Sequence, residues 1–288
     1  MASLHLWIKM TIKEAISWGS LELRDVCERP QYEAELLLAY HLKQDRTYLI
    51  IHDNDNINIK EYKYLIQRRK KNEPYEYIVG EASFYDIYLK VEEGVLIPRP
   101  ETEILIDLVA DIIEKESITS IAEIGVGTGA ISVVLARKFP NLHSIATDIC
   151  DAPLRVAQLN INKYELAKQI ELRKSNLIDK VSESEPVELV VSNPPYIAEN
   201  FLLEPNVVDY EPKEALFGGR VGDELLKQII LDVKERGIKW LACEMGYDQK
   251  EPLQAFINEV GVKSIDFYKD LAGLDRGFII EFHKDKNE

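Results

Sequence analysis

A short polar stretch that follows an apolar run, Ser192 to Tyr196 (SNPPY), carries residue types suited to chemistry. The Asn193 side-chain oxygen and the Pro194 carbonyl can each accept one N–H of an NH2 group. Proline restricts its own φ and the conformation of the residue before it, so both acceptors would be held in place. Tyr196 adds an aromatic ring that can pack against a flat group. Taken alone, the stretch could also be a strand terminator, because prolines end pairing and asparagine favours turns.

A glycine-rich turn, AEIGVGTGAIS, places Gly125, Gly127 and Gly129 between a predicted strand and a predicted helix. In a doubly wound α/β sheet such a turn lies at the carboxyl edge, where ligands bind, and glycine lets the backbone approach them. The alternative is that the glycines only make a tight turn. The spacing is G-x-G-x-G, with Glu123 before it, and not the dinucleotide fingerprint G-x-G-x-x-G. This pattern resembles the first motif of class I S-adenosylmethionine-dependent methyltransferases.

Polar residues also end the next two predicted strands. Asp148 ends IATD, where an acid can accept hydrogen bonds from both hydroxyls of a ribose. Enzymes that bind NAD use an acid in the same way, so Asp148 alone does not identify the ligand. The third strand runs into KSNLID, where the resemblance implies that Asn176 hydrogen-bonds adenine and Leu177 packs against it. Many relatives have an acid at the Asn176 position, so this residue departs from the family pattern.

Beside a methyl donor, the SNPPY stretch predicts a reaction. An amide or aromatic amine nitrogen is a poor nucleophile, because its lone pair is delocalised. Two carbonyl dipoles aimed at its hydrogens would fix its plane and stabilise the positive charge that builds on nitrogen. No general base is needed before transfer, since the product cation loses its proton readily. We therefore predict methylation of a planar NH2 group, with catalytic residues Asn193, Pro194 and Tyr196 and with Asn193, Pro194, Pro195 and Tyr196 binding the substrate.

The first 75 residues are predicted to be a small helical bundle. Thr11 and Asp45 are candidate N-caps, and Pro30 stands where the first turn of a helix accepts proline. The four amphipathic stretches are TIKEAISW, YEAELLLAYHL, RTYLIIH and KEYKYLIQRRKK. They contain no catalytic constellation, so we interpret residues 1–75 as a substrate-recognition domain, with a purely structural role as the alternative. A two-residue rhythm of β-branched and aromatic residues predicts a β-hairpin linker over residues 76–95.

From residue 96 onward, predicted strands and helices alternate. This order is typical of an α/β fold with a mostly parallel sheet that is covered on both faces. Six strand candidates are SIAEIG, LHSIATD, IELRKS, VELVVSN, IKWLACEMG and FIIEFH. The resemblance to class I methyltransferases implies a Rossmann-like, seven-stranded sheet. Residues 96–288 are therefore the predicted S-adenosylmethionine-dependent catalytic domain.

The composition argues against nucleic acid as the main ligand. The formal net charge is -15, whereas a protein that wraps DNA or RNA carries a basic stripe. The one dense basic segment, residues 68–71, is interpreted as a solvated helix end. Three cysteines far apart, with no histidine spacing beside them, predict reduced thiols and no metal site. The reduced thiols are typical of a cytoplasmic protein. No run approaches the ~20 apolar residues of a membrane helix, so we expect no membrane partner, and we expect a monomer.

Further strings favour one substrate. VLIPRPETE (95–103), EIGVGTGAI, VVSNPPYIAE, YEPKEALFGG, CEMGYDQ and KDLAGLDRGF occur in that order. They resemble the HemK/PrmC family, the N5-glutamine methyltransferases of class-1 peptide chain release factors, over about residues 60 to 282. The resemblance implies transfer from S-adenosylmethionine, leaving S-adenosylhomocysteine, to the glutamine of a Gly-Gly-Gln loop. It also implies the donor-binding residues Glu123, Gly125, Val126, Gly127, Thr128, Gly129, Asp148, Asn176, Leu177 and Asn193.

Three loops are interpreted less specifically. IPRPETE would form a wall near the donor, or would only begin a helix with acids in its first turn. Glu211 and Pro212 are expected to border the site. GGRVGDELL is longer than the Gly-Gly-x-x-Gly-Leu stretch common in relatives, which leaves the path of this loop open.

Two other functions remain as alternatives. N-P-P-Y also suits adenine N6, so the chain could be a DNA adenine-N6 methyltransferase. The acidic composition and the lack of a separate basic target-recognition domain argue against this. The other alternative is a non-enzymatic Rossmann-like binding module, against which the glycine motif, Asp148 and N-P-P-Y argue together.

Overall fold

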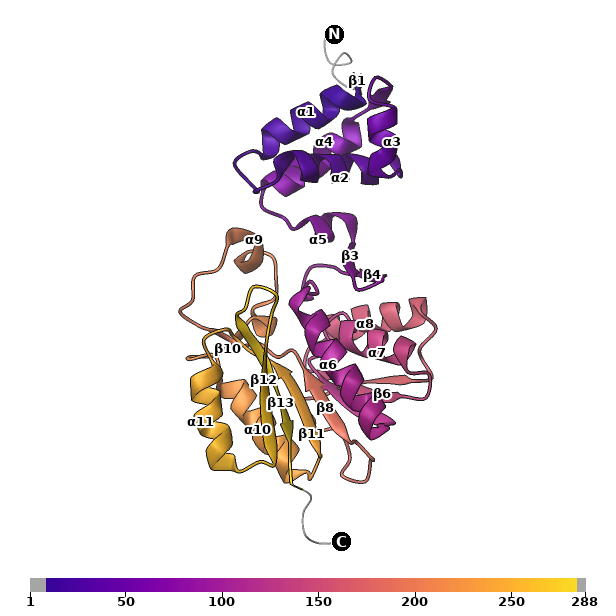
Figure 1. Cartoon of the computed structure of the whole chain (residues 1–288). Helices are drawn as coiled ribbons and strands as arrows, with labels where there is room; N and C mark the ends of the chain where they lie inside the picture. The colour runs from indigo at the N-terminus through magenta and orange to yellow at the C-terminus, as the bar shows by residue number, and fades with distance from the viewer. Residues whose placement is uncertain (1–8, 284–288) are drawn as a thin grey trace. The chain divides into compact units, whose positions relative to one another are not determined.

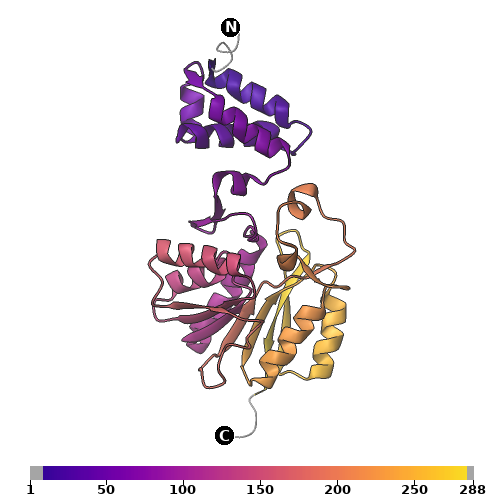
Figure 2. The same ribbon diagram turned by 180° about the vertical axis from the view of Figure 1, so that it is seen from behind.

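The computed structural model describes residues 9–283. The chain divides into two compact units, drawn in Figure 1 and from behind in Figure 2. The helical unit holds the described residues up to Gly80 together with Glu204–Tyr210. The sheet unit holds Glu81–Leu203 and the described residues from Glu211 onward.

The helical unit begins its helices where the sequence predicts. The Thr11 hydroxyl oxygen accepts the Glu14 N–H at 3.2 Å and the Glu14 carboxylate accepts the Thr11 N–H at 2.8 Å, a capping box. Pro30 is the first residue of its helix, and Asp45 accepts the N–H of Tyr48 at 2.8 Å. The three predicted helix starts are confirmed. The helices are α1 (Ile12–Leu23), α2 (Pro30–Leu42), α3 (Arg46–Ile51), α4 (Lys60–Lys70), α5 (Tyr75–Val79) and α9 (Pro205–Val208).

Two features of this unit were not predicted. Strand β1 (Lys9–Thr11) pairs antiparallel with β2 (Asn56–Asn58), which joins the start of the described chain to the loop before α4. The short α9 belongs to the helical unit, although in the sequence it lies between the two segments of the sheet unit. Just beyond α9, the hydroxyl of Tyr210 donates to the Lys71 carbonyl at 2.8 Å.

The basic end of α4 is neutralised by acids of the same unit. Arg68 pairs with Glu73, and Lys70 pairs with Glu22 at 2.6 Å. Arg69 is only 7% exposed and pairs with Glu33 at 2.5 Å. The interpretation of residues 68–71 as a solvated helix end is therefore wrong for Arg69, because its guanidinium ties α4 to α2.

Residues 76–95 are only partly a hairpin. They begin inside α5, which ends where Gly80 adopts a φ of 75°, a left-handed conformation that glycine accepts without strain. The hairpin itself is β3 (Glu81–Phe84) paired with β4 (Ile87–Lys90). The Asn160 side chain accepts the Lys90 N–H at 2.7 Å and donates to its carbonyl at 3.0 Å, which fixes the hairpin on the sheet unit.

The predicted mostly parallel seven-stranded sheet is confirmed. Its strand order is β12-β13-β11-β8-β5-β6-β7, and β13 is the one strand that runs opposite to the other six. The strands are β5 (Ser120–Ile124), β6 (His143–Asp148), β7 (Ile170–Lys174), β8 (Leu189–Ser192), β11 (Trp240–Glu244), β12 (Ser264–Lys269) and β13 (Asp275–Glu281). Strand β12 was not predicted. It is an edge strand with no fully buried residue, so it lacks the apolar run of an inner strand.

Helices cover both faces of the sheet, as Figures 1 and 2 show. Side chains alternate along a strand, so Ile121 packs into the core beneath three helices and Ala122 into the core beneath the other two. The first face carries α6 (Glu101–Glu116), α7 (Ala130–Lys138) and α8 (Asp151–Lys163), and the second carries α10 (Glu224–Glu235) and α11 (Lys250–Val260). Within residues 9–283, no helix is long and apolar enough to cross a membrane.

Candidate active site

The central strands β5 and β8 bring the two sequence motifs together. They are parallel neighbours, with Ile124 opposite Ser192, and the Ser192 hydroxyl donates to the Ile124 carbonyl at 2.9 Å. The next residues along each strand are Gly125 and Asn193. A Cβ added to Gly125 would stand 4.0 Å from the Asn193 carbonyl oxygen. The glycine turn and the SNPPY stretch therefore leave the same sheet edge from adjacent positions.

The glycine turn is folded in a conformation that depends on glycine. Gly125, Gly127 and Gly129 have φ values of 74°, 54° and 83°, a region that other residues rarely adopt. The N–H groups of Gly125 and Val126 both donate to the Thr147 carbonyl at 2.9 Å. The turn is thereby held against β6, at whose end Asp148 lies.

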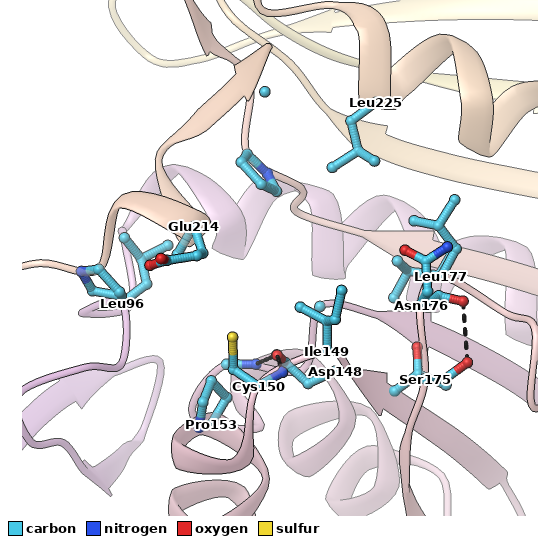
Figure 3. A pocket seen from close by; sticks show the side chains of 18 of the residues that line it. Leu96, Asp148, Ile149, Cys150, Pro153, Ser175, Asn176, Leu177, Glu214 and Leu225 are labelled. Atoms are coloured by element: carbon cyan, nitrogen blue, oxygen red, sulfur yellow. Dashed lines mark hydrogen bonds between the residues drawn. The ribbon is translucent and has the colours of Figure 1, made fainter. Parts of the chain in front are cut away.

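A cavity of about 400 Å³ opens at this edge, a size suited to a small-molecule ligand. Figure 3 shows Asp148, Ile149 and Cys150 on one side of it and Leu225 on the opposite side in this view. Six of the residues predicted from sequence line it: Gly125, Gly127, Asp148, Asn176, Leu177 and Pro195. The cavity is also lined by residues that were not predicted to bind the donor, among them Leu96, Ile149, Cys150, Glu214, Phe217 and Leu225.

Asp148 is the acid that lines the cavity from the end of β6. Its carboxylate accepts the Gly127 N–H at 3.2 Å and the Cys150 N–H at 3.0 Å, so the glycine turn orients it. Burial raises the pKa of Asp148 above its ordinary value, and these backbone donors act in the opposite direction. A carboxylate held in this way can still accept hydrogen bonds from hydroxyl groups of a ligand.

The end of β7 supplies an apolar residue and an amide. Leu177 is buried, has an unusual φ of 43°, and lines the cavity beside Asn176. The Asn176 side chain donates to the Asp179 carboxylate at 3.4 Å, so an acid stands next to the amide that departs from the family pattern. The cavity therefore has an acid at the end of β6 and apolar surface beyond β7. An acid suits the hydroxyls of a ribose, and an apolar surface suits a base.

Glu123 lies behind the turn and does not line the cavity. It is 1% exposed, and its carboxyl oxygen accepts the backbone N–H of Ser132 at 3.0 Å and also bonds the Ser132 hydroxyl. Burial raises its pKa to about 8, while the bonds from Ser132 lower it. Val126, Thr128 and Gly129 are likewise outside the lining, so these residues shape the turn that Gly125 and Gly127 present.

Asn193, Pro194 and Tyr196 stand next to the cavity, and Pro195 alone of the motif lines it. The Asn193 side-chain nitrogen donates to the Thr102 hydroxyl oxygen at 3.0 Å. The Tyr196 hydroxyl donates to Glu244 at 3.0 Å, and the Tyr196 carbonyl accepts from Gln249 at 2.8 Å. Each polar residue of the motif is thus tied to a different part of the sheet unit.

The following loop packs against the motif's backbone. Strand β9 (Ile197–Ala198) pairs with β10 (Phe217–Gly219), after the short helix η1 (Lys213–Ala215). A Cβ at Gly218 would lie 2.3 Å from the Pro195 carbonyl oxygen, and one at Gly222 would lie 2.5 Å from that of Tyr196. Glycine is therefore required where GGRVGDELL closes on the motif.

The segment IPRPETE begins α6, with Glu101 and Glu103 in its first turn. None of its residues is in the cavity lining, although Leu96, just before it, lines the cavity together with Pro212. Arg99 pairs with the buried Glu211 at 2.5 Å, and Glu211 also accepts the Ile97 N–H at 3.2 Å. An ion pair therefore fixes the IPRPETE segment to the loop before η1.

Among residues 9–283, no group of three or more His, Cys, Asp or Glu side chains is arranged to hold a metal ion. Burial raises the pKa of Cys150, which keeps this thiol of the cavity protonated.

Fold and cavity together define a methyltransferase with a Rossmann-like sheet. The family model described as Methyltransferase small domain matches residues 101–208, and the one described as PrmC N-terminal domain matches residues 14–80. The chain belongs to the release factor glutamine methyltransferases. A relative of that name from Clostridium botulinum is 36% identical over 256 residues, 85% of this chain and 90% of the relative. Those from Dictyoglomus turgidum and Coxiella burnetii are 36% and 35% identical, covering 94% and 93% of this chain and 99% and 97% of theirs.

Solved structures of similar fold are more distant in sequence. The hMettl16 catalytic domain in complex with MAT2A 3'UTR hairpin 6 has a TM-score of 0.57 at 20% identity, covering 68% of this chain and 76% of that one. The N-terminal domain of human METTL16 in complex with SAH has a TM-score of 0.50 at 21% identity and the same coverage. At these identities the likeness concerns the fold alone.

Some lining residues carried a signal in the sequence. Leu96 lies within VLIPRPETE, Glu214 and Phe217 lie within YEPKEALFGG, and Ile149 directly follows the acid at the end of β6. Leu225 lies within GGRVGDELL, whose path was left open by the sequence, and it reaches the cavity from the first turn of α10.

The buried carboxyl of Glu123 predicts a pH-dependent stability. Its folded-state pKa, about 8, lies above the ordinary 4.5, so its stabilising effect is complete below about pH 4.5 and is lost as pH rises through about 8. Replacing it with glutamine keeps one acceptor for Ser132 and removes the titration. From pH 5 to pH 8, the wild type should lose on the order of a few kcal/mol of unfolding free energy relative to Glu123→Gln. Chemical denaturation of both proteins across that range measures it, and a constant difference would mean that Glu123 is ionised throughout.

Proposed function

We propose that this methyltransferase transfers a methyl group from S-adenosylmethionine to the side-chain amide nitrogen of the glutamine in the Gly-Gly-Gln motif of class-1 peptide chain release factors. One observation carries the proposal. Asn193 Oδ1 and the Pro194 carbonyl oxygen follow β8 directly, beside the glycine turn, and neither accepts a hydrogen bond from any residue in 9–283. Two such acceptors match the two N–H groups of one planar amide.

The chemistry of the cavity fits the donor. Asp148 can accept hydrogen bonds from ribose hydroxyls, and Leu177, Ile149 and Leu225 offer apolar surface to a purine. The glycine turn allows close backbone approach to the amino-acid part. The METTL16 domain of similar fold is described in complex with SAH, the product of such a donor. We propose the donor-binding set predicted from sequence, with Glu123, Val126, Thr128 and Gly129 acting through the shape of the turn.

When bound, S-adenosylmethionine supplies an electrophilic methyl group on a sulfonium. Asn193 Oδ1 and the Pro194 carbonyl accept the two amide N–H groups of glutamine, which fixes the plane of the nitrogen and turns its lone pair toward the cavity. The same two dipoles stabilise positive charge that develops on nitrogen. The ring of Tyr196 packs against the flat amide, and Pro195 closes the motif against the donor.

The proposed acceptor is a protein amide rather than a base of DNA or RNA. Relatives at 36% and 35% identity are named for glutamine methylation of release factors. The net charge of -15 disfavours a long nucleic-acid surface, and Arg68, Arg69 and Lys70 of the basic segment are each paired with an acid. We propose residues 1–75 as the recognition domain, residues 76–95 as the linker and residues 96–288 as the catalytic domain of a monomer that acts in the cytoplasm.

The proposal predicts transfer of labelled methyl from S-adenosylmethionine to one glutamine of a purified class-1 release factor. The matched control is the same factor with the glutamine of Gly-Gly-Gln replaced by alanine. Label should be incorporated in the first and absent from the second, because alanine offers no NH2 group. Label on both proteins would assign the methyl group to another residue, and label on neither but on DNA would favour the nucleic-acid alternative.

A second prediction separates the role of Asn193 in the reaction from its part in donor binding. Asn193→Ala removes one of two charge-stabilising acceptors, so kcat should fall on the order of a hundredfold. The Kd for the donor, measured by calorimetry, should rise far less than kcat falls, since the removed contact is made mainly in the transition state. Equal losses in kcat and in donor affinity would contradict this role.

A further inference from the structure

A buried carboxyl group connects two polar side chains of the SNPPY stretch, Asn193 and Tyr196. Glu244, at the end of β11, is 1% exposed. Its Oε2 accepts the Thr102 hydroxyl at 2.7 Å, and its Oε1 accepts the Tyr196 hydroxyl at 3.0 Å. Thr102, in the first turn of α6, is 4% exposed and is also the residue to which Asn193 donates. Asn193, Thr102, Glu244 and Tyr196 thus form one continuous chain of hydrogen bonds.

The chain of bonds has a direction. A threonine hydroxyl has a single proton, and here Glu244 takes it. The Thr102 oxygen can therefore only accept from Asn193, and the NH2 end of the Asn193 amide must face it. A reversed amide would set its oxygen against the Thr102 oxygen with no proton between them. Because the two ends of an amide have nearly the same size, hydrogen bonding alone selects between them.

Glu244 acts as an acceptor because its surroundings supply donors. Burial raises the pKa of its carboxyl, and the Thr102 and Tyr196 hydroxyls and the Arg276 guanidinium lower it. The Tyr196 hydroxyl keeps its own proton, since burial and the nearby Glu244 raise its pKa. One hydroxyl therefore donates to each carboxylate oxygen.

We propose that Thr102 and Glu244 are positioning residues that fix the polarity of Asn193, so that Oδ1 is the end available to the acceptor amide. This inference rests on the proposed function, in which Asn193 accepts an N–H of glutamine. With the opposite polarity, Asn193 would turn an NH2 group toward the glutamine NH2, and neither could accept. The same carboxyl group anchors Tyr196, so one buried side chain contacts both Tyr196 and the residue that holds Asn193.

Two further contacts support the assignment. Gln249 donates to the Tyr196 carbonyl at 2.8 Å and accepts the Gly246 N–H at 2.9 Å, which fixes the backbone next to the proposed acceptors. Thr102 lies in IPRPETE, and Glu244 and Gln249 lie in CEMGYDQ. None of these three side chains was assigned a role from the sequence.

Kinetics of two substitutions at one position test the proposal. Thr102→Val keeps the shape of the side chain and removes its hydroxyl, whereas Thr102→Ser keeps the hydroxyl. For Thr102→Val, kcat per folded enzyme should fall about tenfold, the effect of one lost hydrogen bond, with KM for the donor unchanged. Thr102→Ser should recover most of kcat, because it keeps the hydroxyl although it loses the methyl group. Glu244→Gln offers only one acceptor to two hydroxyls and should also lower kcat.

A measurement without substrate keeps this test independent of the proposed function. In wild-type protein labelled with 15N, the side-chain amide protons of Asn193 should give a cross-peak to the Thr102 methyl group. One of the two should exchange slowly with solvent and become faster in Thr102→Val. The Asn193→Ala variant identifies the resonance by its loss.

The possible results are distinct. Slow exchange, the cross-peak and recovery by serine support the proposal. A kcat for Thr102→Val equal to that of Thr102→Ser, or Asn193 amide protons without contact to Thr102, would overturn it. If the wild type methylates no release factor, the proposed function fails, and the cross-peak still decides whether Thr102 orients Asn193.

Discussion

The site depends on one buried acidic side chain, the carboxyl group of Glu244. A polar group in the interior is costly unless hydrogen-bond partners surround it, and here Thr102 and Tyr196 each supply a hydroxyl. Those donors come from α6 and from the segment after β8, so the carboxylate joins three strings that are far apart in sequence. Because Thr102 donates its proton to Glu244, its oxygen is the partner for the NH2 end of the Asn193 amide. The hydrogen bonds that the buried Glu244 needs thus also bear on the orientation of the Asn193 amide.

A second constraint is the order of strands in the sheet. Since β5 and β8 are parallel neighbours in register, the glycine turn and Asn193 begin side by side. The cavity and the SNPPY stretch therefore do not need a flexible loop to bring them together. Gly218 and Gly222 then allow the loop of β9 and β10 to close on the motif from the other side.

Much of this architecture was predictable from local patterns, such as caps at Thr11 and Asp45, the glycine turn, and six of seven strands. The failures have a common physical cause. Strand β12 is an exposed edge without an apolar run, and α5 is a single turn within a segment of strand-like composition. The burial of Glu123 and the bond between Thr102 and Glu244 depend on tertiary packing across distant residues, which no spacing rule encodes.

A crystal structure of the chain with S-adenosylhomocysteine and a Gly-Gly-Gln peptide would test the central claim most directly. The account predicts that the glutamine side-chain nitrogen lies within hydrogen-bonding distance of both Asn193 Oδ1 and the Pro194 carbonyl oxygen, while Asn193 Nδ2 remains on Thr102. A glutamine amide bound away from these two oxygens, or an Asn193 side chain turned off Thr102 in the complex, would contradict it.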